Sequence, residues 1–78
     1  MLDARLVGGV IARYRQRAGL SQEVLSGLAG IGRSHLSAIE RGERKPTMET
    51  FYRLSAAMNV KMSELAAAVE EAMEAGEK

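Results

Sequence analysis

The chain has 78 residues, of which 46 % are hydrophobic and 27 % charged, a length and balance that predict one small folded domain over residues 1–78 and exclude a disordered chain. It contains no cysteine and one histidine, which excludes disulfides, thiolate metal sites and two-histidine metal sites, so we expect neither a metal nor a cofactor. The net charge of +1 identifies no partner by itself, and no apolar run approaches the roughly 18 residues that span a bilayer, so we expect a cytoplasmic protein with no membrane partner.

The first predicted helix ends at Gly19. Apolar residues recur at helical spacing through Val7 and Ile11, and a glycine after such a run is typical of a left-handed C-cap. Gly8 and Gly9 lie in its first turn, and each costs roughly 1 kcal/mol in a helix interior. We therefore expect the regular helix to begin near Gly9.

The second predicted helix runs from an N-cap at Ser21 to a stop at Gly30. Serine is favoured at an N-cap because its hydroxyl accepts a hydrogen bond from the first turn of the helix. Helical spacing predicts that this helix buries Leu25, Leu28 and Ala29.

The third predicted helix follows after only two residues and spans 32–41. Leu36 and Ile39 are its expected inward residues, and Gly42 ends it. A basic connection over 44–46 then leads to the next element.

Two more helices complete the pattern, which is helical throughout and therefore all-α. Thr47 is the predicted N-cap of the fourth helix, which ends at Asn59. The last helix is predicted over about 62–74 with Ser63 as its N-cap, and residues 75–78 are expected to fray.

The segment over about 21–41 meets the demands of two short helices that cross steeply. Such a crossing needs a small residue between the helices, a left-handed backbone in the turn and an apolar plug after it, and Ser26, Gly30 and Ile31 supply these in register. The pattern indicates a helix-turn-helix whose second helix, 32–41, enters the DNA major groove. The alternative from the residues alone is a plain helical hairpin in a small bundle.

Five sequence blocks resemble the phage-repressor and Cro-like helix-turn-helix family, also called the xenobiotic-response-element-like family. They are Val-Gly-x-x-Ile-x-x-x-Arg (7–15), Gly-Leu-Ser-Gln-Glu-x-Leu (19–25), Ala-Gly-Ile (29–31), Ile-Glu-Arg-Gly-x-Arg-Lys-Pro-Thr (39–47) and Val-x-Met-x-Glu-Leu (60–65). The resemblance implies a compact five-helix, lambda-repressor-like domain in which helices 2 and 3 form the DNA-reading unit of a transcription regulator. Stand-alone chains of this size resemble restriction–modification controllers, small phage repressors and antitoxin-type autorepressors.

The start and outer side of the third helix carry the candidate base-reading residues. Arg33 is the strongest of them, because its guanidinium fork can donate twice to guanine N7 and O6, although a phosphate contact is the alternative for it. Position on the helix predicts four base-reading residues: Arg33, Ser34, Ser37 and Ala38. The resemblance implies base contact for Arg33, Ser34 and Ala38.

Other polar residues of the motif are expected to contact phosphates and to position the domain. The resemblance implies this role for Gln22, which also buttresses the reading helix, and His35 is as well explained as a solvated side chain. The full set is Ser21, Gln22, His35, Arg41, Arg44 and Lys45. Glu43 places an acid among these cations, so we expect a weaker phosphate grip in that loop. The resemblance also implies a structural pair, Arg15 and Glu40, that joins the first helix to the end of the third.

Charge and size point to DNA and to a second copy of the chain. Residues 1–60 carry a net charge of +4 and residues 61–78 one of −3, and such segregation favours a polyanion at one face. One domain of this size offers three or four readable base pairs, too few to select an operator, whereas two copies double the number. The last helix has apolar residues to spare for a dimer seam: Met62, Ala66, Val69 and Met73. The alternative is that this helix only caps its own domain.

We therefore expect a homodimeric, sequence-specific regulator on a short near-palindromic operator. The alternative is a protein-interaction module of the same fold that contacts a toxin or an RNA polymerase subunit, with DNA contact secondary. An enzyme is not expected, because a triad would have to centre on His35 and no strand precedes the glycines of 27–32.

Overall fold

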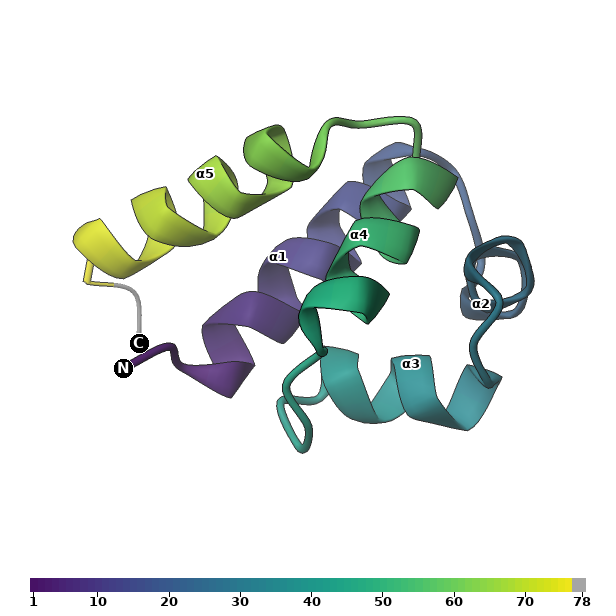
Figure 1. Ribbon diagram of the computed structural model, residues 1–78. Coiled ribbons are helices and arrows are strands. Elements are labelled where there is room, and N and C mark those ends of the chain that lie inside the picture. The colour runs from purple at the N-terminus through teal and green to yellow at the C-terminus, as the bar shows by residue number, and fades with distance from the viewer. Residues whose placement is uncertain (77–78) are drawn as a thin grey trace.

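The computed structural model describes residues 1–76, and that part of the chain consists of five helices joined by short turns, without a strand. They are α1 (Ala4–Arg17), α2 (Gln22–Ala29), α3 (Arg33–Glu40), α4 (Met48–Ala57) and α5 (Met62–Glu74) (Figure 1). The predicted all-α, five-helix fold is confirmed. Residues 77 and 78 of the expected frayed tail lie outside the described residues.

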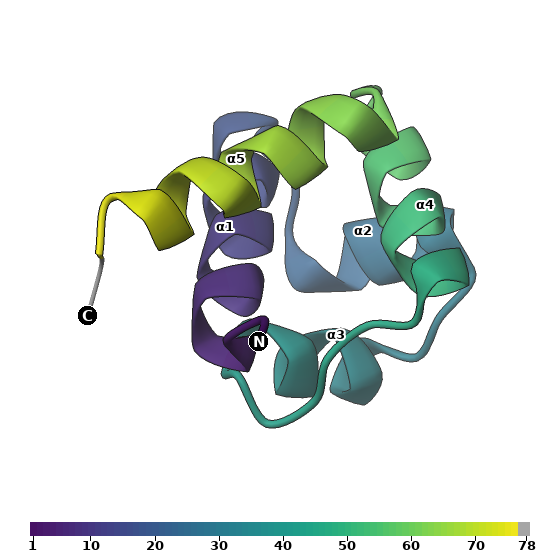
Figure 2. The same cartoon turned by 60° about the vertical axis from the view of Figure 1, so that its left-hand side comes forward.

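The five helices enclose an aliphatic core, and each of them packs against two others. α1 contacts both α3 and α5, α2 packs on α4, and α5 lies across α1 (Figures 1 and 2). The side chains of Ile11, Leu25, Leu36, Leu54 and Leu65 are fully buried, and burial of each contributes about 1.5–3 kcal/mol. None of the described helices is both long enough and apolar enough to cross a membrane.

The expectation that α1 begins near Gly9 is wrong. The helix starts at Ala4, where the side chain of Asp3 caps it by accepting a hydrogen bond from the Arg5 N–H at 2.8 Å. Gly8 is buried against α3, and a Cβ atom on it would collide with the backbone oxygens of Ile39 and Glu40, the second at 2.9 Å. The helix tolerates this glycine because its missing side chain lets α1 and α3 approach closely.

Two further expectations are corrected. Leu28 is 62 % exposed, because the stripe that α2 turns inward is formed by Leu25, Ser26 and Ala29, and Leu28 lies about a third of a turn from its centre. α5 begins at Met62 with Lys61 as its N-cap, and no side chain caps it. Ser63 therefore lies inside the first turn of α5.

The turn between α2 and α3 has the expected construction. Gly30 adopts a left-handed conformation with φ 73°, and the N–H of Ile31 donates to the carbonyl of Ser26 at 3.0 Å. Ser26 is 4 % exposed, and its hydroxyl donates to the carbonyl of Glu23 at 3.1 Å. A small side chain at the crossing and a glycine in the turn thus allow the two helices to cross within one core.

Candidate nucleic-acid interface

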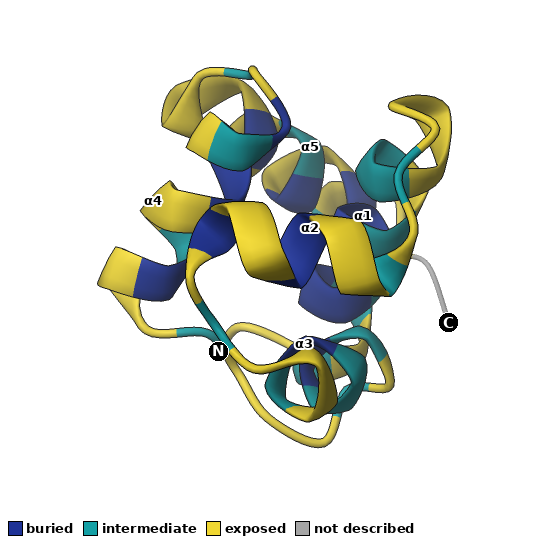
Figure 3. Ribbon diagram, turned by 90° about the vertical axis from the view of Figure 1, so that its right-hand side faces the viewer, coloured by how far each residue is buried: buried dark blue, intermediate teal, exposed yellow. Residues whose placement is uncertain are grey.

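α3 lies at one edge of the molecule with one side open. Leu36 and Ile39 have no exposed surface and form the side of α3 that packs against α1 and α2, whereas the opposite side of α3 is exposed or half-buried (Figure 3). The expected base-reading residues all lie on the open side: Arg33 and Ser34 are exposed, and Ser37 and Ala38 are half-buried. Helix geometry spreads them, together with Arg41, over an arc of roughly 140°.

The side chains expected to contact phosphate lie on the same side or flank it. Arg44 and Lys45 are exposed in the loop after α3, and Ser21, which is exposed, caps α2 by accepting the N–H of Val24 at 3.0 Å. His35 is half-buried at the margin of the open side. Gln22 points to the end of α3, where its Nε2 donates to Glu40 Oε1 at 2.9 Å, and this contact supports the reading helix as expected.

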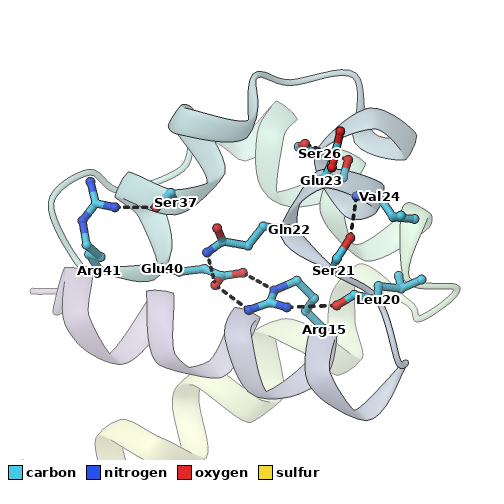
Figure 4. A network of polar contacts seen from close by, with 10 residues as sticks. All are labelled: Arg15, Leu20, Ser21, Gln22, Glu23, Val24, Ser26, Ser37, Glu40 and Arg41. Atoms are coloured by element: carbon cyan, nitrogen blue, oxygen red, sulfur yellow. Dashed lines mark hydrogen bonds and ion pairs between the residues drawn. The ribbon is translucent and has the colours of Figure 1, made fainter.

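Glu40 is the centre of a polar network that holds the carboxyl end of α3 (Figure 4). Arg15 donates from Nε and Nη2 to the two carboxylate oxygens of Glu40 at 2.7 and 3.0 Å, and from Nη1 to the carbonyl of Leu20 at 2.9 Å. The side chains of Arg15 and Glu40 are only 13 % and 7 % exposed. Hydrogen bonding to Glu40 raises the pKa of Arg15 despite its burial. The network joins α1, α2 and α3, so it fixes the position of the open side of α3.

A second ion pair lies on the open side itself and was not foreseen as a pair. Arg41 donates from Nε and Nη2 to the two oxygens of Glu43, both at 2.9 Å, and from Nη1 to the hydroxyl of Ser37. The hydrogen bonds and charge of Arg41 lower the pKa of the Glu43 carboxyl, and those of Glu43 raise the pKa of Arg41. The signal in the sequence was the Arg-Gly-Glu order, because a left-handed glycine turns the chain back toward the residue before it.

The expected seam residues separate into two groups. Met62 and Ala66 are exposed and Met73 is half-buried, whereas Val69 is 5 % exposed and belongs to the core of its own chain. Val69 is thus packed against its own domain and offers little surface to a second copy. Next to the seam, a groove of about 710 Å³ runs between α5 and the start of α4, and its lining includes Phe51, Ala66 and Met73.

Residues 1–76 hold no cluster of three or more His, Asp or Glu side chains that could bind a metal. The chemistry of the open side is that of hydrogen-bond donors and cations on a short helix. In the structure, α3 packs on α2 after a left-handed turn at Gly30, and one side of α3 stays open. This arrangement is the reading unit of a helix-turn-helix domain.

Comparison with known proteins identifies the family. The profile of the helix-turn-helix family matches residues 11–65, and the chain belongs to this family of DNA-binding transcription regulators. The uncharacterised HTH-type transcriptional regulator y4dJ of Sinorhizobium fredii is 40 % identical over 67 residues, which cover 86 % of this chain and 87 % of that protein. The resemblance to Cro-like regulators inferred from the sequence is confirmed.

Restriction–modification controllers are also similar to this chain. The control protein C.SmaI of Serratia marcescens is 34 % identical over 55 residues, which cover 70 % of this chain and 66 % of that protein. The crystal structure of the controller protein C.AhdI from Aeromonas hydrophila matches with a TM-score of 0.78 at 32 % identity, covering 83 % of this chain and 98 % of that one.

Proposed function

We propose that the protein is a sequence-specific regulator that binds a short, near-palindromic operator as a homodimer, with α3 in the major groove. The observation that carries the proposal is the open side of α3. It presents hydrogen-bond donors and cationic side chains, and the opposite side of the helix is fully buried. The network around Glu40 supports it further, because a recognition helix must be held rigidly to discriminate between bases.

Within this proposal Arg33 is the principal base-reading residue. It is exposed at the first position of α3, and in residues 1–76 its guanidinium has no hydrogen-bond or ion-pair partner that would compete with a base. Ser34, Ser37 and Ala38 are proposed to contact neighbouring base edges or a thymine methyl group. The phosphate contacts are proposed for residues at the start of α2, on α3 and in the segment after α3: Ser21, Gln22, His35, Arg41, Arg44 and Lys45.

The proposed dimer uses the groove beside α5. Met62, Ala66 and Met73 supply apolar surface next to this groove or within it, and Lys45 and Glu70 supply opposite charges in its lining. In a two-fold dimer each of these charges can meet the opposite one on the other copy. Two α3 helices would then meet successive major grooves roughly 34 Å apart.

Selection of bound sequences from a random duplex pool tests the proposal. We expect one enriched motif with two-fold symmetry and half-sites about one helical turn apart. Arg33→Ala should weaken binding to that motif by about 1–3 kcal/mol and relax the preference at one base pair of each half-site. Arg17→Ala is the matched control, because it removes the same charge from the exposed end of α1, where Arg17 stacks on Tyr14 at 5.4 Å. An unchanged preference in the Arg33 variant would overturn its assignment.

A protein-interaction role is the second candidate, favoured by one observation. Val24 and Leu28 lie one turn apart on α2 and are 48 % and 62 % exposed, so together they form a small apolar surface that a partner protein could cover. A salt titration against random duplex separates the two functions. A DNA-binding dimer loses affinity steeply with salt because phosphate contacts release counterions, and a flat response would favour the interaction role.

A further inference from the structure

The turn at the carboxyl end of α3 brings Glu43 close to Arg41. Gly42 has φ 79°, and the N–H of Glu43 donates to the carbonyl of Ala38 at 2.9 Å, which closes the end of the helix. A side chain could not replace the glycine without movement, because a Cβ atom there would lie 2.6 Å from Cγ of Arg5. The backbone therefore places the Cα atom of Glu43 within reach of the Arg41 side chain.

Glu43 and Ser37 together engage most of the N–H donors of Arg41. A guanidinium has five N–H groups, and three of them donate, two to the carboxylate of Glu43 and one to the hydroxyl of Ser37. The two others stay available on a side chain that is 55 % exposed. The positive charge of Arg41 is thus balanced by the carboxylate of Glu43, and its side chain is held along the open side of α3. An unpaired arginine would sample many rotamers.

We propose that Glu43 is a specificity-determining residue, which holds Arg41 in one place so that this arginine contacts a phosphate only when the operator fixes the register. The inference rests on the proposed function of α3. On an operator, base contacts place each phosphate at a set position relative to α3. The pre-ordered guanidinium of Arg41 can then donate its two remaining N–H groups to a phosphate while it keeps its hydrogen bonds to Glu43. On other DNA, no phosphate keeps that position.

The affinity for random-sequence duplex DNA should therefore rise when Glu43 loses its charge. Binding to random duplex is electrostatic and independent of register, and Arg41 freed from the carboxylate can follow any phosphate. On the operator the same change removes the ordering of Arg41, so the freed side chain must be immobilised on binding. The ratio of operator affinity to random affinity should fall, by up to roughly tenfold.

The test compares Glu43→Gln with the unsubstituted protein on two duplexes of equal length, the sequence most enriched from a random pool and a scrambled version of it. We expect the variant to bind the scrambled duplex more tightly, with a salt slope steeper by about 0.9 per subunit for one added phosphate contact. Glu49→Gln is the matched control, because it removes the same charge from an exposed pair, Glu49 with Arg53 at 3.0 Å on α4. In the Arg41→Ala background Glu43→Gln should no longer change the ratio.

The outcomes separate the inference from the function on which it rests. If the unsubstituted protein shows no preference for any duplex, the proposed function fails and the inference fails with it. If the protein does discriminate but Glu43→Gln and Glu49→Gln alter binding to both duplexes equally, only the role of Glu43 is overturned. A ratio that falls with Glu43→Gln alone, and only while Arg41 is present, supports it.

Discussion

Arg15 of α1 and Glu40 of α3, which are 25 residues apart in the chain, form a two-pronged ion pair with N–O distances of 2.7 and 3.0 Å. Gln22 of α2 donates to the same carboxylate. Three helices therefore share one largely buried anion, and the end of α3 cannot shift without breaking charge-assisted hydrogen bonds. The open side of α3 is in this way set by residues that do not lie on it.

We expect Arg15→Ala or Glu40→Ala to lower the free energy of unfolding by about 3 kcal/mol, because each leaves the other member largely buried without its main partner. The double variant should lose less than the sum of the two single losses. The exposed pair of Glu49 and Arg53 is the control, with an expected coupling of at most about 0.5 kcal/mol. Chemical denaturation measures the free energy of unfolding of each variant. Additive losses at Arg15 and Glu40 would show that the two side chains do not stabilise the domain as a pair.

The two glycines of α1 should respond in opposite directions to alanine. Gly8→Ala places a methyl group against the carbonyl oxygens of Ile39 and Glu40, so we expect a loss of about 3 kcal/mol from overpacking against backbone. Gly9→Ala meets no atom within 4 Å and should stabilise the helix by up to about 1 kcal/mol. Thermal unfolding of the two variants gives the comparison, and similar effects at both positions would show that α1 and α3 do not meet closely at Gly8.

The features that the sequence predicted well are those with local causes. The turn after α2 follows from Gly30, because glycine adopts φ 73° at no steric cost, and the caps at Ser21 and Thr47 follow from their hydroxyls. Local spacing also placed Leu36 and Ile39 on the buried side of α3. These signals lie within a few residues of the feature that they determine.

The features that the sequence missed depend on contacts between distant segments. The cost of Gly8 and Gly9 predicted a late start of α1, but the close approach of α3 favours a glycine at the first of them. Leu28 fits helical spacing for burial, yet the neighbours of α2 cover another part of its surface. The helical spacing of Val69 predicts a place in a dimer seam, but the packing of α5 on its own domain buries this side chain.

Two leucines of α2 allow this difference to be measured. Leu25 has no exposed surface, whereas Leu28 is 62 % exposed. Leu25→Ala should therefore cost about 2–5 kcal/mol of stability, and Leu28→Ala about 0.5 kcal/mol or less, since surface changes rarely exceed that. Urea denaturation of the two variants is sufficient, and a large loss at Leu28 would mean that this side chain is covered in solution.

A charge placed in the groove beside α5 should separate the proposed dimer without unfolding the domain. Ala66 is exposed and lines the groove, so Ala66→Lys keeps the fold but places an ammonium group where a second copy would exclude water. We expect the dimer dissociation constant to rise by a factor of about ten or more. A factor of ten corresponds to about 1.4 kcal/mol, and a desolvated unpaired charge costs more than that. Ala56→Lys, at an exposed position of α4 outside the groove, is the control, and sedimentation equilibrium without DNA measures both. Equal association of the two variants would move the interface elsewhere.

Glu43 should report directly on its pairing with Arg41. Because Arg41 stabilises the ionised carboxylate, the pKa of Glu43 lies below its usual value of 4.5, and the stability that the pair contributes is present above that value and lost as the pH falls through the lowered pKa. In Arg41→Ala we expect the pKa of Glu43 to rise back toward 4.5, measured by the carboxyl carbon resonance in an NMR titration. Ser37→Ala should leave it low, because Ser37 contacts the guanidinium and not the carboxylate. Since the transition lies at acid pH, the pair stays intact over roughly pH 5–8, and in that range protonation of Glu43 does not affect DNA binding by the unsubstituted protein. A pKa of Glu43 that did not move in Arg41→Ala would show that the two side chains are not paired in solution.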